Sequence, residues 1–190
     1  MLFKGIFTEE LIYQNADIID WKELCKHIDL TAFSDKFWED FACEFDWNII
    51  CQFQTLSERL MIKFLDRINW NIISSHQKLS EDFIRRFSCE VFWREICMNQ
   101  KLSCEFIDEF QEYVSWISVS AHQELSEDFI RKFKDKIEWN NFSSRQKISE
   151  EFVIEMIEYI SISHLAGNPN IDQSLRNRIN QIKLASLPNP

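Results

Sequence analysis

Residues 70–93 read WNIISSHQKLSEDFIRRFSCEVFW, and this stretch decides the fold. It begins and ends on tryptophan, and its pattern recurs through the chain at intervals of 23 residues. Three columns in one register carry the recurrence: Trp47, Trp70, Trp93, Trp116 and Trp139; Gln54, Gln77, Gln100, Gln123 and Gln146; Ser57, Ser80, Ser103, Ser126 and Ser149. A fixed period of this length is typical of proteins built from stacked structural repeats.

The segment that follows each Ser predicts an amphipathic helix. Phe83, Ile84 and Phe87 are spaced so that they lie on one side of a helix. Ser80 directly precedes them, and its hydroxyl can accept a free N–H of the first turn. Acidic residues follow the Ser, where the helix dipole favours negative charge. We therefore expect a helix that begins immediately after each Ser.

The segment from Trp to Gln predicts a second, shorter helix. Trp70, Ile73 and Gln77 have the spacing of one helical side. A short strand is the rival interpretation because Ile72 and Ile73 are β-branched. The spacing favours the helix, with the polar residue that precedes four of the tryptophans as its cap. The expected capping residues are Asp20, Asp46, Asn69 and Ser115.

The repeats predict an all-α protein, a short α-solenoid of about seven tandem 23-residue two-helix repeats with a divergent C-terminal capping helix. We treat residues 1–190 as a single repeat domain. Residues 1–21 form a partial first repeat, 21–162 the tandem repeats, 163–186 a divergent cap and 187–190 a tail. Three extra residues lie between Trp21 and Phe33. In the last copy Ile162 replaces Trp, and Asp172 stands where Ser is expected.

Composition argues against two classes of partner. The chain has 31 acidic and 21 basic residues, a net charge of -10. Such a chain repels nucleic-acid phosphate and anionic membrane surfaces. No leader opens the sequence, and no apolar run is long enough to span a bilayer. We therefore expect neither a nucleic-acid partner nor a membrane partner.

The sequence also lacks the motifs of catalytic and metal sites. The six Cys form no C-x-x-C pair, and the four His form no H-E-x-x-H. There is no Walker sequence, no G-x-S-x-G and no Gly-rich phosphate loop. We expect reduced thiols, no metal, no cofactor, no catalytic residue and no enzymatic activity.

The repeat columns differ in what they predict. The Trp column can be a stacking platform, but core packing is the favoured interpretation. The Gln column is interpreted as a ladder that satisfies backbone groups at the turn. The column just before Gln varies, and recognition residues are expected there: Phe53, His76, Asn99, His122 and Arg145, with the adjacent Met98. A tolerated solvent-exposed surface is the alternative for this column.

The repeat resembles a motif of viral proteins. Its residues are Trp70, Ile73, Ser74, Gln77, Leu79, Ser80, Glu81, Phe83 and Ile84, and again Trp116, Gln123, Leu125, Ser126, Glu127, Phe129 and Ile130. They are similar to the W-x-x-I-S-x-x-Q-x-L-S-E-x-F-I repeats of predicted proteins from large DNA viruses of amoebae and other protists. The resemblance implies a viral protein, placed in the host cytosol or in the virus particle. The resemblance implies no catalytic residue for this chain.

We expect a non-enzymatic protein–protein interaction scaffold with a host or viral protein as its partner. Solenoids offer extended surfaces suited to this role. One alternative is a structural or assembly component of the virus particle. A second is an acidic inhibitor that mimics nucleic acid, suggested by the net charge and by acid pairs such as Glu81–Asp82 and Glu127–Asp128.

Overall fold

The computed structural model describes residues 7–185, and this part of the chain is helical without any strand. Residues 1–6 of the partial first repeat, residue 186 of the cap and the tail 187–190 lie outside the described residues. The elements are α1 Glu9–Asn15, a 3-10 turn Ala16–Ile18, α2 Trp21–His27, α3 Asp35–Asp40, α4 Trp47–Phe53, α5 Glu58–Lys63, α6 Trp70–His76, α7 Glu81–Arg86, α8 Trp93–Asn99, α9 Cys104–Glu109, α10 Trp116–His122, α11 Glu127–Lys132, α12 Trp139–Arg145, α13 Glu150–Glu155, α14 Ile162–Ala166 and α15 Gln173–Ala185.

The six-residue helices that follow a serine, called Ser helices here, are α3, α5, α7, α9, α11 and α13. Each begins directly after its Ser, whose hydroxyl accepts the N–H three residues on. The N···O distance is 3.1 Å from Phe83 to Ser80 and 3.2 Å from Phe129 to Ser126. The predicted caps are confirmed, and they fix where every Ser helix starts.

The helices that begin on tryptophan, called Trp helices here, are α2, α4, α6, α8, α10 and α12. Each has seven residues, so the choice of a helix over a strand is confirmed. Asp46 caps α4 by accepting the N–H groups of Asn48 and Ile49 at 3.1 and 3.3 Å. Helix α14 occupies the same place in the last repeat but begins on Ile162 and has only five residues.

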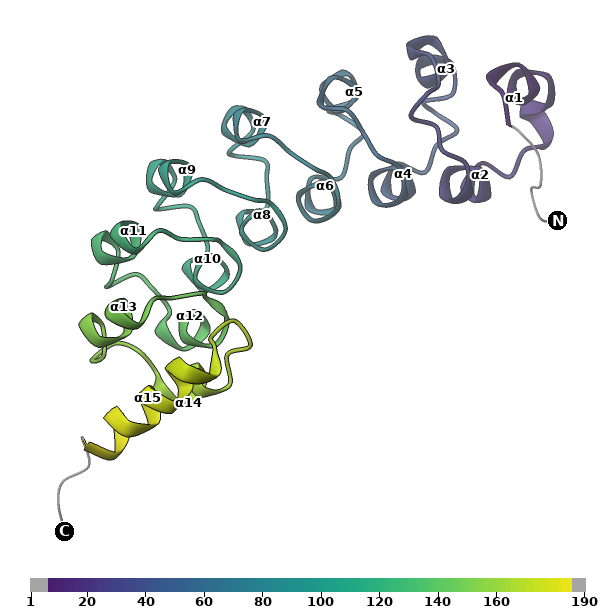
Figure 1. Cartoon of the computed structure of the whole chain (residues 1–190). Helices are drawn as coiled ribbons and strands as arrows, with labels where there is room; N and C mark the ends of the chain where they lie inside the picture. Colours follow the sequence, from purple (N-terminus) through teal and green to yellow (C-terminus); the bar gives the residue numbers. More distant parts are fainter. Residues whose placement is uncertain (1–6, 186–190) are drawn as a thin grey trace. The chain divides into compact units, whose positions relative to one another are not determined.

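The chain forms two compact units, Met1–Phe92 and Trp93–Pro190. In the first unit the Trp helices α2, α4 and α6 pack side by side in one layer, with the Ser helices α3, α5 and α7 in a second (Figure 1). In the second unit α8, α10, α12 and α14 form the first layer and α9, α11 and α13 the second (Figure 1). Each unit is therefore a stack of two-helix repeats, and the predicted α-solenoid class is confirmed.

The core of each unit lies between its two layers. Fully buried rings and aliphatic chains from both layers meet there, including Phe37, Met61 and Ile73 in the first unit and Phe106 and Phe152 in the second. Burying a side chain of this size contributes about 1.5–3 kcal/mol relative to leaving it exposed. The two short helices of a repeat are marginal alone, so this shared burial holds them.

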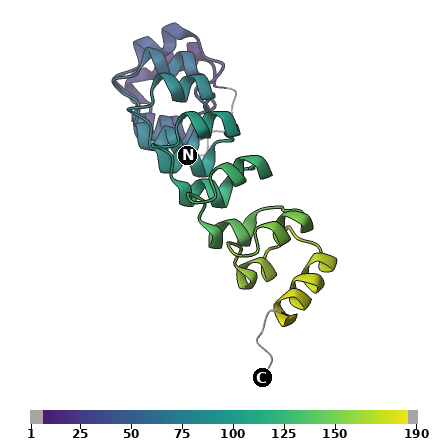
Figure 2. The same cartoon turned by 90° about the vertical axis from the view of Figure 1, so that its left-hand side faces the viewer.

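Two departures from the period are absorbed at turns. The three extra residues lie in the turn after α2, where the Asp29 carboxylate accepts the N–H and the hydroxyl of Thr31 at 2.9 and 2.6 Å. At the other end α15 is a 13-residue helix that packs on α14, seen in yellow in Figure 2. Asp172 accepts the N–H of Leu175 at 2.7 Å and thus takes the capping role expected of it.

No helix among residues 7–185 has the length and apolar character to cross a membrane.

Candidate functional site

Within each unit, the Gln column ties a Trp helix to the repeat before it. The Gln77 side-chain oxygen accepts the N–H of Leu56 at 2.8 Å, and its nitrogen donates to the carbonyls of Cys51 and Gln54 at 2.7 Å each. Gln54 and Gln123 make the same three bonds, and both are buried. The ladder therefore fixes the backbone at the C-terminal end of these Trp helices.

Asn168 takes the place of Gln in the last repeat. Its side-chain nitrogen donates to the carbonyls of Ser143 and Gln146 at 2.9 and 2.8 Å, and the residue is fully buried. Register counting points instead to Pro169, which lies 23 residues after Gln146. The shift arises because α14 is two residues shorter than the other Trp helices, so the shorter amide of Asn reaches the same carbonyls.

A column of small side chains supports the next Trp helix. The Ser74 hydroxyl donates to the Trp70 carbonyl at 2.7 Å and accepts the Phe92 N–H at 3.1 Å. Cys51 stands in this column, and its sulfur accepts the Asn69 N–H at 3.5 Å. Cys97 stands there too, and burial raises the pKa of its thiol to about 11. Such thiols are inert toward chemistry that needs a thiolate.

The variable column lies at the last residue of each Trp helix. The side chains at its positions are all exposed: Phe53 and His76 in the first unit, Asn99, His122 and Arg145 in the second. The neighbouring Met98 is half-buried. Each exposed residue directly precedes a residue of the Gln column, so an exposed side chain stands beside a backbone position that hydrogen bonds hold in place.

In the second unit part of the variable column lines a groove of about 520 Å³. Its lining includes His122 and Arg145 from the ends of α10 and α12, with Lys147 and Glu124 beside them. Burial, and secondarily the charge of Arg145, lowers the pKa of His122. The groove thus has two cationic side chains, one carboxylate and an imidazole whose pKa lies below its ordinary value.

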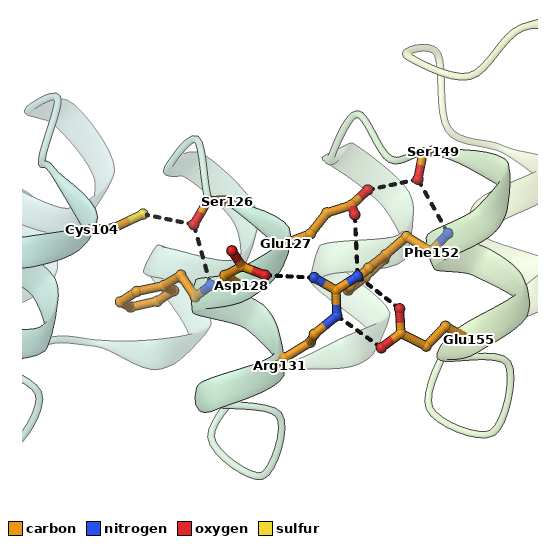
Figure 3. A network of polar contacts seen from close by, with 9 residues as sticks. Cys104, Ser126, Glu127, Asp128, Arg131, Ser149, Phe152 and Glu155 are labelled. Atoms are coloured by element: carbon orange, nitrogen blue, oxygen red, sulfur yellow. Dashed lines mark hydrogen bonds and ion pairs between the residues drawn. The ribbon is translucent and has the colours of Figure 1, made fainter.

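Several charged residues on the Ser helices pair with one another. Figure 3 shows Arg131 on α11, which pairs with Asp128 at 2.7 Å, with Glu127 at 3.4 Å and with Glu155 of the next Ser helix at 2.7 Å. Ser149 donates to the second oxygen of Glu127 at 2.6 Å (Figure 3). Lys132 pairs in the opposite direction, with Asp108 of the preceding Ser helix. Acids in this network are neutralised locally, so they do not form an open anionic surface.

The Trp column lies half-buried between the two layers of each unit. The Trp116 ring packs on Phe133, with centroids 5.1 Å apart, and its N–H donates to the Gln111 carbonyl at 3.0 Å. Trp47 makes the matching contact with Phe64 at 4.9 Å and donates to Ala42 at 2.9 Å. Both rings are thus packed on a phenylalanine and held by the indole N–H to the turn before their helix.

The part of the chain that the structure describes contains no group of three or more His, Cys, Asp or Glu side chains arranged to hold a metal ion. Its cysteines are all free, with Cys25, Cys51 and Cys97 buried. Comparisons with protein-family profiles, with characterised proteins and with solved structures found no match to the chain. The resemblance to viral repeats therefore stays a prediction.

Proposed function

We propose that the chain is a non-enzymatic protein-binding scaffold and that the variable column carries recognition. One observation supports this above all. Side chains that differ from repeat to repeat occupy one structural position, are exposed there, and adjoin a buried amide that holds the backbone. A rigid backbone with exchangeable side chains loses little conformational freedom when it binds a partner.

The residue types in the column suit a protein partner. Phe53 is 53% exposed and offers an apolar ring, whereas His122 and Arg145 line a groove large enough to accept a partner side chain. Arg and aromatic residues are enriched among the side chains that dominate binding energy at interfaces. On the resemblance to viral repeats, we propose a host or viral protein as the partner, met in the host cytosol or in the virus particle.

The acidic-inhibitor alternative receives less support than the scaffold. A nucleic-acid mimic needs unpaired carboxylates in series, but Glu127, Asp128 and Glu155 all pair with Arg131. Glu150 likewise pairs with Arg178. These four acids of the second unit are therefore committed to contacts within the chain.

A quantitative pull-down from host-cell and virus-infected lysates tests the proposal. The test variant carries Phe53→Ala, His76→Ala, His122→Ala and Arg145→Ala. The control variant carries four alanines at exposed positions on or just after Ser helices, Lys36, Glu105, Glu151 and Glu158. Both variants keep the core and the Gln ladder, so both are expected to fold like the wild type.

We expect one or more proteins that the wild type and the control variant capture and that the test variant loses. This result identifies a binding scaffold and its recognition residues together. Partners retained by the test variant, or a lysate from which nothing is enriched, would contradict the role of the variable column.

A further inference from the structure

In four repeats, the residue ten positions after the capping Ser lies beside the tryptophan of the preceding Trp helix. These residues are Arg67, Tyr113, Lys136 and Tyr159. In the Trp116 repeat, the Lys136 ammonium lies 5.7 Å from the centroid of the indole ring. The ammonium also pairs with the Glu112 carboxylate at 2.7 Å and donates a hydrogen bond to the Gln111 side-chain oxygen at 3.0 Å. An internal cation thus fills the space between an aromatic ring and a carboxylate.

The Trp47 repeat fills the same space with a guanidinium. Arg67 donates to the Ala42 carbonyl at 3.2 Å, and the indole N–H of Trp47 donates to the same oxygen at 2.9 Å. A second nitrogen of Arg67 lies 3.6 Å from the sulfur of Cys43. Ala42 and Cys43 have the register of Gln111 and Glu112 in the Trp116 repeat. The position ten residues after the capping Ser therefore holds a lysine in the Trp116 repeat and an arginine in the Trp47 repeat.

The Trp21 repeat has carboxylates where the Trp116 repeat has cations. Counted from the capping Ser, Glu44 stands at the position of Lys136 and Asp40 at the position of Lys132. Asp17 corresponds to Glu112 and keeps its negative charge. Together with Trp21 and Phe41, these three carboxylates line a cavity of about 380 Å³.

The charge of this cavity is not balanced within the described part of the chain. Among residues 7–185, Asp17, Asp40 and Glu44 form no ion pair. Asp40 accepts the Tyr13 hydroxyl at 2.8 Å, and burial together with this carboxylate raises the pKa of Tyr13 to about 12. Residues 9–46 contain eleven acidic and three basic residues, a net charge of -8 out of -10 for the whole chain.

The C-terminal end of α3 adds to the negative electrostatic potential of this cavity. Asp40 is the last residue of α3, where the helix dipole favours a cation, so a carboxylate there does not serve helix stability. The Trp21 and Phe41 rings lie 4.7 Å apart by their centroids and supply the aromatic wall of the cavity. An aromatic ring beside carboxylates is the combination that binds organic cations.

We propose that this cavity binds the arginine or lysine side chain of a basic segment in a partner protein, at the place that Lys136 occupies beside Trp116. Arginine suits the site better, because its planar guanidinium stacks on an aromatic ring and donates to two carboxylates at once. The site belongs to the first unit and is separate from the variable column. It therefore adds a second point of contact to the proposed scaffold.

The test uses the full chain and a defined probe. The probe is an acetylated peptide of alternating Arg and Ser, and its control is the same peptide with citrulline, which keeps the shape of Arg without its charge. Binding is followed at the Trp21 indole N–H signal in two-dimensional NMR, assigned with the variant Trp21→Phe. We expect the Arg peptide to shift this signal and the citrulline peptide to bind at least ~10-fold more weakly, which corresponds to about 1.4 kcal/mol.

Two matched variants distinguish peptide binding in the cavity from general electrostatic attraction to the acidic chain. Glu44→Lys places a cation inside the cavity, as Lys136 does beside Trp116. Glu90→Lys changes the charge equally at the same register position of the Trp70 repeat, where the Arg86 guanidinium already stands 5.2 Å over the Phe87 ring. We expect Glu44→Lys to weaken peptide binding at least ~10-fold and Glu90→Lys to change it by less than about twofold.

If Glu44→Lys disturbs the fold, Asp17→Asn provides a second test of peptide binding. This substitution removes one cavity carboxylate and keeps the side-chain shape. It is expected to weaken binding several-fold. Equal weakening by Glu44→Lys and Glu90→Lys, equal binding of both peptides, or an unmoved Trp21 signal would overturn the proposal. The pull-down on the variable column alters none of these residues, so failure of one proposal is distinguishable from failure of the other.

Discussion

The Trp116 and Trp21 repeats share a scaffold and differ in the charge placed upon it. In both, the tryptophan packs on the phenylalanine that directly follows the next Ser helix, with ring centroids 5.1 Å apart for Phe133 and 4.7 Å apart for Phe41. Beside Trp116 a lysine of the chain completes the site, whereas beside Trp21 a glutamate leaves a cavity. The difference teaches that the core and the Gln column fix the backbone of both repeats. The surface residues decide whether the site beside the tryptophan is filled by a cation of the chain itself or is left open for a cation of a partner.

The shared core should give the largest effects, and they should be similar in both repeats. Phe37 is fully buried in the first unit, and Phe129 lies under Trp116 in the second. Replacing either with Ala is expected to cost about 3–5 kcal/mol, since each substitution removes a packed ring and leaves a cavity. Urea unfolding measures the loss. A cost below about 1 kcal/mol at either site would show that the two repeats do not share a core.

The Gln ladder should give the next largest effect, and here the two regions should differ. Gln54 is 5% exposed and makes three hydrogen bonds to the Trp21 repeat. Gln146 is half-buried, and its nitrogen donates to Ser120 and Gln123 of the Trp116 repeat. Gln54→Ala is expected to cost about 2–3 kcal/mol, because it leaves buried backbone groups without partners.

Gln146→Ala is expected to cost less, because water can reach the groups it exposes. Gln54→Met and Gln146→Met keep the volume and remove only the hydrogen bonds, so they serve as controls. Equal losses for Gln54→Ala and Gln146→Ala would contradict the link between burial and ladder strength.

The serine caps should give an effect of about 1 kcal/mol. Ser126 caps α11, whereas Ser34 caps α3 and also donates to the Glu9 carboxylate at 2.7 Å. Ser34→Ala is therefore expected to cost more than Ser126→Ala. Thermal unfolding of both variants, with Ser→Thr as the cap-preserving control, measures the difference. Unchanged melting temperatures for both alanine variants would refute the role of the caps.

The smallest effect on stability is expected for Lys136→Glu, which gives the Trp116 repeat the charge of the Trp21 repeat. The substitution removes a half-exposed ion pair with Glu112 and a contact with the indole ring. We expect a cost of about 1 kcal/mol or less, as is usual for surface pairs and exposed cation–aromatic contacts. Lys136→Gln is the neutral control. A loss of several kcal/mol would mean that the internal cation holds the fold together.

Features of the fold that are local in sequence could be predicted from it. Ser80 with its acidic first turn, and the spacing of Trp70, Ile73 and Gln77, contain enough information to place two helices, because caps and apolar spacing act within a few residues. The role of Asn168 could not be predicted in the same way. It depends on a helix two residues shorter than its counterparts, which moves the amide out of register.

The site beside Trp21 was also beyond the reach of sequence patterns. Glu44 can be assigned to this site only once the structure shows that the chain after α3 returns to Trp21. The three-residue insertion after α2 further hides its equivalence to Lys136. The variable column could be located by comparison of the repeats, but the groove it lines in the second unit required the positions of Lys147 and Asn170.

A charge swap tests most directly the claim that a repeat tryptophan has a cation site, filled from within or from outside. The double variant Glu44→Lys and Lys136→Glu keeps the net charge of the chain and exchanges the two environments. With the Arg–Ser peptide, the indole signal that shifts should change from Trp21 in the wild type to Trp116 in the variant. A peptide that still shifts Trp21 alone, or that shifts neither signal, would contradict the claim.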